Sequence, residues 1–143
     1  MAEQAIEPSK RQVTRPKLAC RLFRRRQGRA AQLPGAGEIE LENTSEEVLE
    51  IEVQMSPLQH LNLVVRNSDG QLLSEGHYGN CFSPLERPYA LRLQPGEKYT
   101  GPVSLMGNVP PEKRLPGKYT VQAVYEYHAL RSVSEPFEVE LPG

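Results

Sequence analysis

Alternation of apolar and polar residues runs through most of this chain and predicts β-strands. It is clearest in LPGKYTVQAVYEYHALRSVSEPFEVEL, residues 115–141. A Pro-Gly turn there precedes a strand whose apolar face carries Tyr119, Val121, Ala123, Tyr125 and Tyr127. After a short break a second strand has Val133, Phe137, Val139 and Leu141 on its apolar face. Period-two patterning buries one face of a sheet and leaves the other in water, so the pattern predicts an antiparallel β-domain.

The same alternation recurs upstream. It predicts strands at 17–25, 38–42, 49–55, 61–65, 71–75, 89–93 and 99–105, separated by turns such as Asn67-Ser-Asp-Gly70 and Gln94-Pro-Gly-Glu97. No stretch has the period of a substantial helix. Short strands at regular spacing favour a sandwich of about seven to nine antiparallel strands. Pro102 and Pro136 fall inside predicted strands, which indicates edge or bulge positions.

The chain organisation follows from these patterns. Residues 17–143 are expected to form a single β-sandwich domain, and residues 1–16 a disordered basic lead-in. The opening MAEQAIEPSKRQ has no apolar secretion-signal core, and no stretch approaches the length of a transmembrane helix. We therefore expect a soluble cytoplasmic protein without a membrane span, as a monomer or weak oligomer.

Charge is distributed unevenly. Residues 1–35 carry nine basic and two acidic residues, whereas residues 36–143 carry eight basic and sixteen acidic ones. The basic cluster at Arg21, Arg24, Arg25, Arg26 and Arg29 is a candidate anion-binding site for nucleic acid or a lipid headgroup. The alternative is a basic strand end that pairs with acidic strand faces in the same molecule. No aromatic residues are interleaved for base stacking, so nucleic acid is the less expected partner.

No residue pattern indicates catalysis or a metal centre. His60, His77 and His128 are far apart in sequence. Cys81 with His77 or His128 is the one candidate nucleophile pair, and no strained turn presents it. His77 and Cys81 share a loop, which leaves a weak metal site conceivable beside the simpler reading of a surface histidine and a packed cysteine. We expect a non-enzymatic protein without metal or cofactor.

Two smaller features have structural interpretations. Asn43-Thr-Ser45 is a formal glycosylation sequon that we interpret as a turn. Cys20 shares an apolar strand face with Leu18 and Leu22, whereas Cys81 belongs to an irregular loop. We therefore expect that the two cysteines form no disulfide.

Four segments carry a family resemblance: ENTSEEVLEIEV (42–53), LVVRNSDGQLL (63–73), LRLQPGEKY (91–99) and LPGKYTVQAVY (115–125). Their order resembles immunoglobulin-like β-sandwiches, and among them the intracellular proteinase inhibitor type. The resemblance covers about residues 36–127 and implies an immunoglobulin-like fold, with protease inhibition as one alternative function. Tyr119, after a Pro-Gly turn, resembles the tyrosine corner of such folds. The chain departs from the inhibitor pattern in having no tryptophan.

The leading functional hypothesis is an interaction or structural domain that contacts another, unidentified protein through loops or an exposed edge strand. The irregular segment 76–88 offers Tyr78, Phe82 and Leu85 as candidate anchors. The alternative for this segment is that it folds back and caps the end of the sandwich. Anionic-ligand binding through the arginine cluster is the second functional class, and protease inhibition the third.

Overall fold

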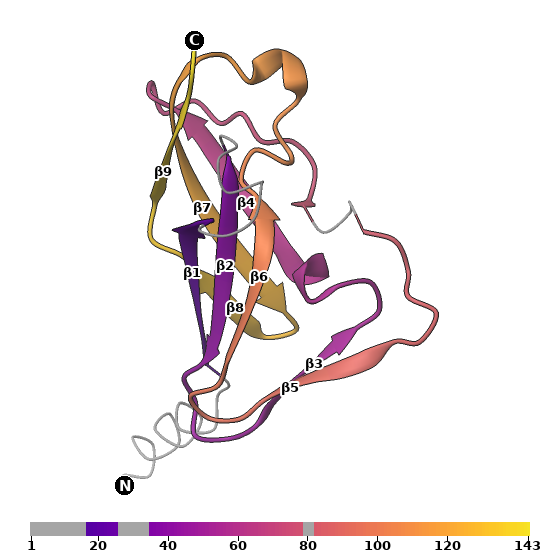
Figure 1. Cartoon of the computed structure of the whole chain (residues 1–143). Helices are drawn as coiled ribbons and strands as arrows, with labels where there is room; N and C mark the ends of the chain where they lie inside the picture. The colour runs from indigo at the N-terminus through magenta and orange to yellow at the C-terminus, as the bar shows by residue number, and fades with distance from the viewer. Residues whose placement is uncertain (1–16, 26–34, 79–81) are drawn as a thin grey trace, which may run out of the picture.

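The computed structural model describes residues 17–25, 35–78 and 82–143, which form nine strands arranged in packed antiparallel layers (Figure 1). The strands are β1 (Leu18–Arg24), β2 (Ala36–Asn43), β3 (Leu49–Val53), β4 (Leu61–Asn67), β5 (Tyr89–Leu93), β6 (Lys98–Ser104), β7 (Gly117–Tyr127), β8 (Leu130–Val133) and β9 (Phe137–Leu141). Two 3-10 turns, η2 (Pro57–His60) and η4 (Pro111–Lys113), are the helical elements of these ranges. None of the helices described is long and apolar enough to cross a membrane. Residues 1–16, the predicted lead-in, lie outside the described residues.

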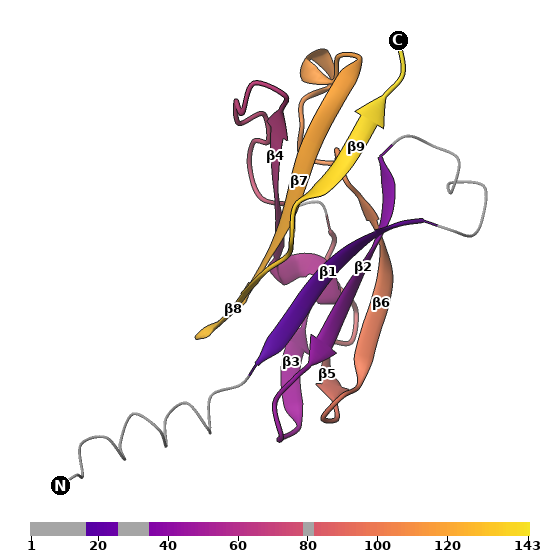
Figure 2. The same ribbon diagram turned by 90° about the vertical axis from the view of Figure 1, so that its left-hand side faces the viewer.

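Three groups of strands build the layers. One sheet has the order β1-β2-β6, a second has β4-β7-β8 with β9 also paired to β7, and β3 pairs with β5 in a two-stranded ribbon. All of these pairings are antiparallel. Figure 2 shows the β1-β2-β6 layer beside the layer that holds β4, β7 and β9. The predicted all-β antiparallel sandwich is confirmed.

The core lies between the layers and follows the alternation of the sequence. Most of the inward positions that the pattern predicts are buried, among them Leu41, Leu49, Ile51, Leu63, Val65, Tyr119, Val121, Ala123, Tyr125 and Val139. Burial of each large aliphatic side chain contributes roughly 1.5–3 kcal/mol. Leu91 is only partly buried, because it belongs to β5, whose sole strand partner among the described residues is β3.

The predicted orientation of Val133 is wrong, and a bulge explains the difference. The partner of β7 changes register between Val124↔Val133 and Val121↔Phe137, so three residues of the β8–β9 segment face two of β7. One extra residue reverses the alternation. Ser134 is therefore buried and Val133 is 43% exposed. The Ser134 hydroxyl accepts a 2.8 Å hydrogen bond from the Ala123 N–H inside the bulge.

The strand predicted at 71–75 is reduced to one isolated bridge, Arg66↔Leu72. The turn before it forms as expected, with Gly70 at φ 81° and the Asn67 side chain accepting from two backbone N–H groups of the turn. The ladder then stops because the next donor of β4, the Val65 N–H, bonds to the Ser74 hydroxyl and not to a carbonyl group.

Tyr119 makes the contact expected of a tyrosine corner. Its side chain is 5% exposed, and its hydroxyl donates a hydrogen bond to the carbonyl oxygen of Leu115, four residues upstream. The bond fixes the loop that leads into β7 against the start of that strand.

Asn43 joins three parts of the fold. Its side chain is fully buried, and its amide nitrogen donates to the carbonyl oxygens of Glu47 and Leu93, each at 2.8 Å. Its amide oxygen accepts from the N–H and the hydroxyl of Ser45. Its backbone exchanges bonds with Gly96 and Glu97 in the turn before β6. The sequon is therefore a structural turn whose amide hydrogens are both used, as the sequence interpretation predicts.

Replacement of Asn43 by alanine should lower the free energy of unfolding by about 2–4 kcal/mol, because it leaves the Leu93 carbonyl oxygen without this buried hydrogen bond and removes the bonds to Glu47 and Ser45. Asn67→Ala is the matched control: this asparagine also accepts two backbone hydrogen bonds, but in an exposed turn, so its loss should stay below about 1 kcal/mol. Urea unfolding of both variants measures the difference. Equal losses would contradict the structural role assigned to Asn43.

Candidate functional site: the open side of the sandwich

One edge of the sandwich is formed by β1, whose outer backbone groups have no hydrogen-bond partner among the described residues. Strand β1 pairs with β2 alone, in a register that runs from Leu18↔Asn43 to Arg24↔Gly37. The bonds Thr44 N–H to Lys17 O and Arg25 N–H to Ala36 O show that the odd-numbered residues of this segment bond to β2. Because hydrogen-bonding direction alternates along an antiparallel strand, the even-numbered residues direct their N–H and C=O groups away from the sheet. These are Leu18, Cys20, Leu22 and Arg24.

The outer edge of β4 is closed. Its outward groups bond to the segment that follows the hairpin turn: the Leu73 N–H donates to the Val65 carbonyl oxygen at 2.8 Å, and the Val65 N–H donates to the Ser74 hydroxyl at 3.1 Å. The Asn108 amide donates to the Leu63 carbonyl oxygen at 3.2 Å. Side chains and an irregular segment thus occupy the positions that an added strand would need.

The β6 edge is closed in another way. The Ser104 N–H, which points away from β2, donates to the hydroxyl of Tyr78 at 3.0 Å. Pro102 lies two residues earlier, so its nitrogen points to the same outer side and has no hydrogen to donate. The expected edge position of the Gly-Pro pair is confirmed. Proline on an edge strand blocks pairing with a further strand.

Two hollows lie along the open side between β1 and the β8–β9 segment, whose edges face the viewer in Figure 2. The first is lined by Cys20, Leu22, Phe23, Val133, Pro136 and Phe137, among others. The second is lined by Arg24, Leu105, Phe137, Val139, Glu138 and Glu140, among others. Each has a volume of about 380 Å³, and Phe137 borders both. We call this pair of hollows with the β1 edge the β1 groove.

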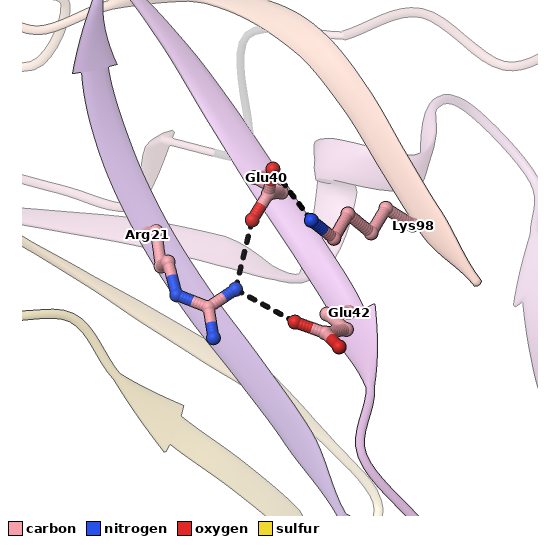
Figure 3. A network of polar contacts seen from close by, with 4 residues as sticks. All are labelled: Arg21, Glu40, Glu42 and Lys98. Carbon is pink, nitrogen blue, oxygen red and sulfur yellow. Dashed lines mark hydrogen bonds and ion pairs between the residues drawn. The ribbon is translucent and has the colours of Figure 1, made fainter. Parts of the chain in front are cut away.

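Arg21 lies at the centre of β1 on the outer face of its sheet. Its Nη1 lies 2.8 Å from Glu40 Oε1 and 2.9 Å from Glu42 Oε1, and Lys98 approaches the other oxygen of Glu40 at 3.8 Å (Figure 3). The hydrogen bonds to Glu42 and Glu40 raise the pKa of the Arg21 guanidinium. The basic strand therefore meets the acidic face of β2 within the molecule. Arg21, at the centre of the strand, makes this contact, and no ion pair among the described residues involves Arg24 or Arg25 at the expected strand end.

The other arginines of the cluster are placed apart from this network. Arg24 is exposed and borders the second hollow. Arg25 is half-buried, and its backbone N–H bonds to Ala36. Arg26 and Arg29 lie outside the described residues. Within the described part of the chain, the structure does not gather the candidate anion-binding residues on one surface.

The candidate anchors of segment 76–88 point in different directions. Tyr78 is 7% exposed and its ring packs edge-on against Phe82, with ring centroids 5.9 Å apart. Phe82 is partly buried against the core. Leu85 alone of the three is exposed, and its N–H donates a 2.7 Å hydrogen bond to the carbonyl oxygen of Gln54. Tyr78 and Phe82 thus pack as expected for a segment that folds back onto the sandwich.

Cys20 is a free, buried cysteine on the inner face of β1. Burial raises the pKa of its thiol from 9.0 to about 12, against a smaller opposing effect of Arg21. Cys81, and with it the Cys81–histidine pair, lies outside the described residues. Elsewhere in the described residues no group of three or more His, Cys, Asp or Glu side chains could hold a metal ion.

Sequence reasoning missed the β1 groove because it depends on two facts of tertiary structure. One is that β1 has a strand partner on one side only, and the other is the register change that exposes Val133. Pro136 was the available signal for the bulge. The absence of proline from residues 18–24, in a chain that places one in each of two other edge segments, was the available signal for the open edge.

Comparisons with known proteins identify no family. No family profile matches the sequence, and no curated protein matches it. Among solved structures, the chain is similar to a β-glucosidase from Listeria innocua in complex with gluconolactone, with 14% identity and a TM-score of 0.42 over 90% of this chain and 16% of that one. A Northeast Structural Genomics Consortium target gives 13% identity and a TM-score of 0.36 over 91% and 89% of the two chains. A β-glucosidase from Erythrobacter marinus has 15% sequence identity to this chain and a TM-score of 0.32, and the match covers 84% of this chain and 16% of that one. The chain thus spans a small part of either glucosidase, and similarities at this level carry no argument about activity.

Arg21→Gln should lower the free energy of unfolding by at most about 1 kcal/mol, because the Arg21 side chain is 44% exposed and exposed ion pairs are weak. The loss should shrink as salt is raised to about 1 M, since ions screen the attraction. Arg87→Gln, at an exposed position without an ion pair among the described residues, is the control. A loss that salt leaves unchanged would contradict an electrostatic role.

The Cys20 thiol should resist alkylation in the native protein. In a Cys81→Ser background at pH 8, iodoacetamide should modify it about a hundredfold more slowly than in urea, since the thiolate is the reactive form. The folded pKa lies above the unfolded value, so the thiol favours the folded state below pH 9 and this contribution is lost as pH rises towards 12. Equal native and denatured rates would show that Cys20 is not held in the core.

Proposed function

We propose that this protein is a non-enzymatic, immunoglobulin-like interaction domain that binds an extended segment of another protein along β1. The observation that carries the proposal is a run of four residues beside two hollows, Leu18, Cys20, Leu22 and Arg24, whose outward backbone groups have no partner in the part of the chain that the structure describes. An extended peptide can complete such an edge as an additional strand, with main-chain bonds supplying affinity and side-chain pockets supplying specificity.

The contrast among the edges supports this choice. Edge strands are normally protected against pairing by proline, bulges or covering segments. The described structure protects β4 with a covering segment and β6 with Pro102, and the β8–β9 edge is interrupted by its bulge at Ser134–Pro136. Strand β1 has seven residues and no proline, and no strand pairs with its outer side among the described residues. Strand β5 also has one strand partner there, but it has five residues and borders neither hollow. An edge kept open in this way is consistent with use as a binding surface.

The two other functional classes have less support. Anion binding by the arginine cluster as a unit has less support, because Arg21 already binds Glu40 and Glu42 through Nη1 and Arg24 borders the second hollow apart from that network. Protease inhibition stays a prediction that follows from the sequence resemblance. The cytoplasmic location and the monomeric or weakly oligomeric state likewise stay predictions.

A pair of substitutions at Cys20 tests the proposal. Cys20→Pro removes one outward N–H that the fold itself does not use, whereas Cys20→Ala removes the same thiol and keeps the N–H. Proline is tolerated on an edge strand when its nitrogen faces outward. Circular dichroism and urea unfolding first establish that both variants are folded.

The three proteins are then used as bait in native lysate. The wild type and Cys20→Ala should capture the same partner, and Cys20→Pro should lose it. If the folded proline variant captured that partner as well as the alanine variant does, binding along β1 would be refuted.

A further inference from the structure

We propose that the strand received by β1 is an acidic one, in which glutamate or aspartate on the outer face alternates with apolar residues that point into the β1 groove. This inference rests on the proposed function and names the chemistry of the partner. It is argued from the charge of β1, from the unused donors of Arg21 and from the apolar lining of the hollows.

The charge of the strand selects against many partners. Residues 17–25 contain Lys17, Arg21, Arg24 and Arg25 and no acidic residue. A second copy of β1 paired with this edge would bring like charges opposite one another, which is destabilising across a strand pair. A strand with acidic residues would gain attraction at the same positions. The edge is therefore open to hydrogen bonding but selective in charge.

Strand β2 shows which neighbour the outer face of β1 accepts. Its outward side chains Glu38, Glu40 and Glu42 lie beside β1, and Arg21 binds the last two. Both bonds leave from Nη1, so Nη2 and Nε of Arg21 have no partner among the described residues (Figure 3). A guanidinium has five N–H donors and can bind further carboxylates in its plane. Arg21 can therefore hold one acid of a strand on its other side.

The inner positions of an added strand would face the hollows. Leu22, Val133 and Phe137 line the first, and Leu105 and Val139 line the second, so side chains placed there would bury apolar surface. Glu138 and Glu140 border the second hollow and outnumber Arg24, the one basic side chain among the described residues that line it, so the net negative charge of this rim disfavours an inward carboxylate. Acidic residues are consequently favoured on the outer face beside Arg21, and apolar residues in the positions between them.

Two synthetic probes test this chemistry: capped, fluorescein-labelled peptides of alternating glutamate and valine, or of alternating lysine and valine. We expect the acidic peptide to bind at least about tenfold more tightly by fluorescence anisotropy, and to bind less as salt is raised. On binding, the backbone amides of Leu18, Cys20, Leu22 and Arg24 should become protected from hydrogen exchange. Protection elsewhere, with these amides unchanged, would overturn the assignment of the site.

Charge and groove variants provide the matched controls. Arg24→Glu should weaken the acidic peptide about threefold to tenfold, while Arg87→Glu, in a distant exposed segment, should leave it unchanged. Val133→Asn removes apolar surface at the rim of the first hollow without changing the charge and should weaken binding, whereas Val48→Asn, at a similarly exposed valine (40% against 43%), should not. Unfolding curves establish that each variant is folded.

The outcomes separate this inference from the proposed function. If the lysine peptide bound as well as the glutamate peptide, or if neither bound at concentrations up to about 1 mM, the acidic chemistry would be overturned. Loss of the native partner by Cys20→Pro would still stand as evidence for β1 itself. If Cys20→Pro bound the acidic peptide normally, both the inference and the proposed use of the edge would fail.

Discussion

The hydrogen bonds of Asn43 hold together the parts of this fold that the layers alone do not connect. The β3–β5 ribbon shares no strand pairing with the β1-β2-β6 sheet among the described residues. Asn43, at the end of β2, bonds through its side chain to the loop before β3 and to the last residue of β5, and through its backbone to the turn before β6. A buried polar group of this kind is stable only when every donor and acceptor is satisfied. The ribbon is thereby fixed to the end of β2 and to the turn before β6.

The second constraint is the bulge between β8 and β9. By adding one residue opposite β7, it turns Ser134 inward and Val133 outward, and it breaks the outer edge of the layer at Pro136. The Ser134 hydroxyl replaces the carbonyl group that a regular strand would offer to Ala123. The interior therefore remains satisfied while the edge becomes irregular. Because this irregular edge lies along β1, the open side of the sandwich has one continuous strand edge and one interrupted one.

Most of the fold could be predicted from local patterning, and the exceptions share a cause. Strands such as β2, β4 and β7 have clean alternation, and their inward residues are buried as the period predicts. The predicted orientation of Val133 was wrong because a single inserted residue reverses a period-two pattern. Pro136 indicated a bulge or an edge, but it did not show which residues before it face inward. The predicted strand at 71–75 does not form as a full strand, because the Ser74 hydroxyl accepts the hydrogen bond of the Val65 N–H in place of a backbone carbonyl group. The candidate site was harder still, since whether an edge is covered depends on segments far away in the sequence.

The basic charge near the start of the sequence falls in part on β1, where it affects which strands can pair with the outer edge. Strand β1 is basic and has two edges, and the one that faces β2 is matched by glutamates that leave part of the Arg21 guanidinium unused. Along the other edge, the backbone groups have no strand paired with them in the described structure. A second copy of β1 paired with this edge would bring its own basic side chains close to Arg21 and Arg24, and these like charges would repel. An edge strand can be protected from self-association by charge alone, without proline or a cover, provided that the charge is of one sign. In the proposed binding mode, that protection leaves the backbone groups available to a segment of the opposite charge.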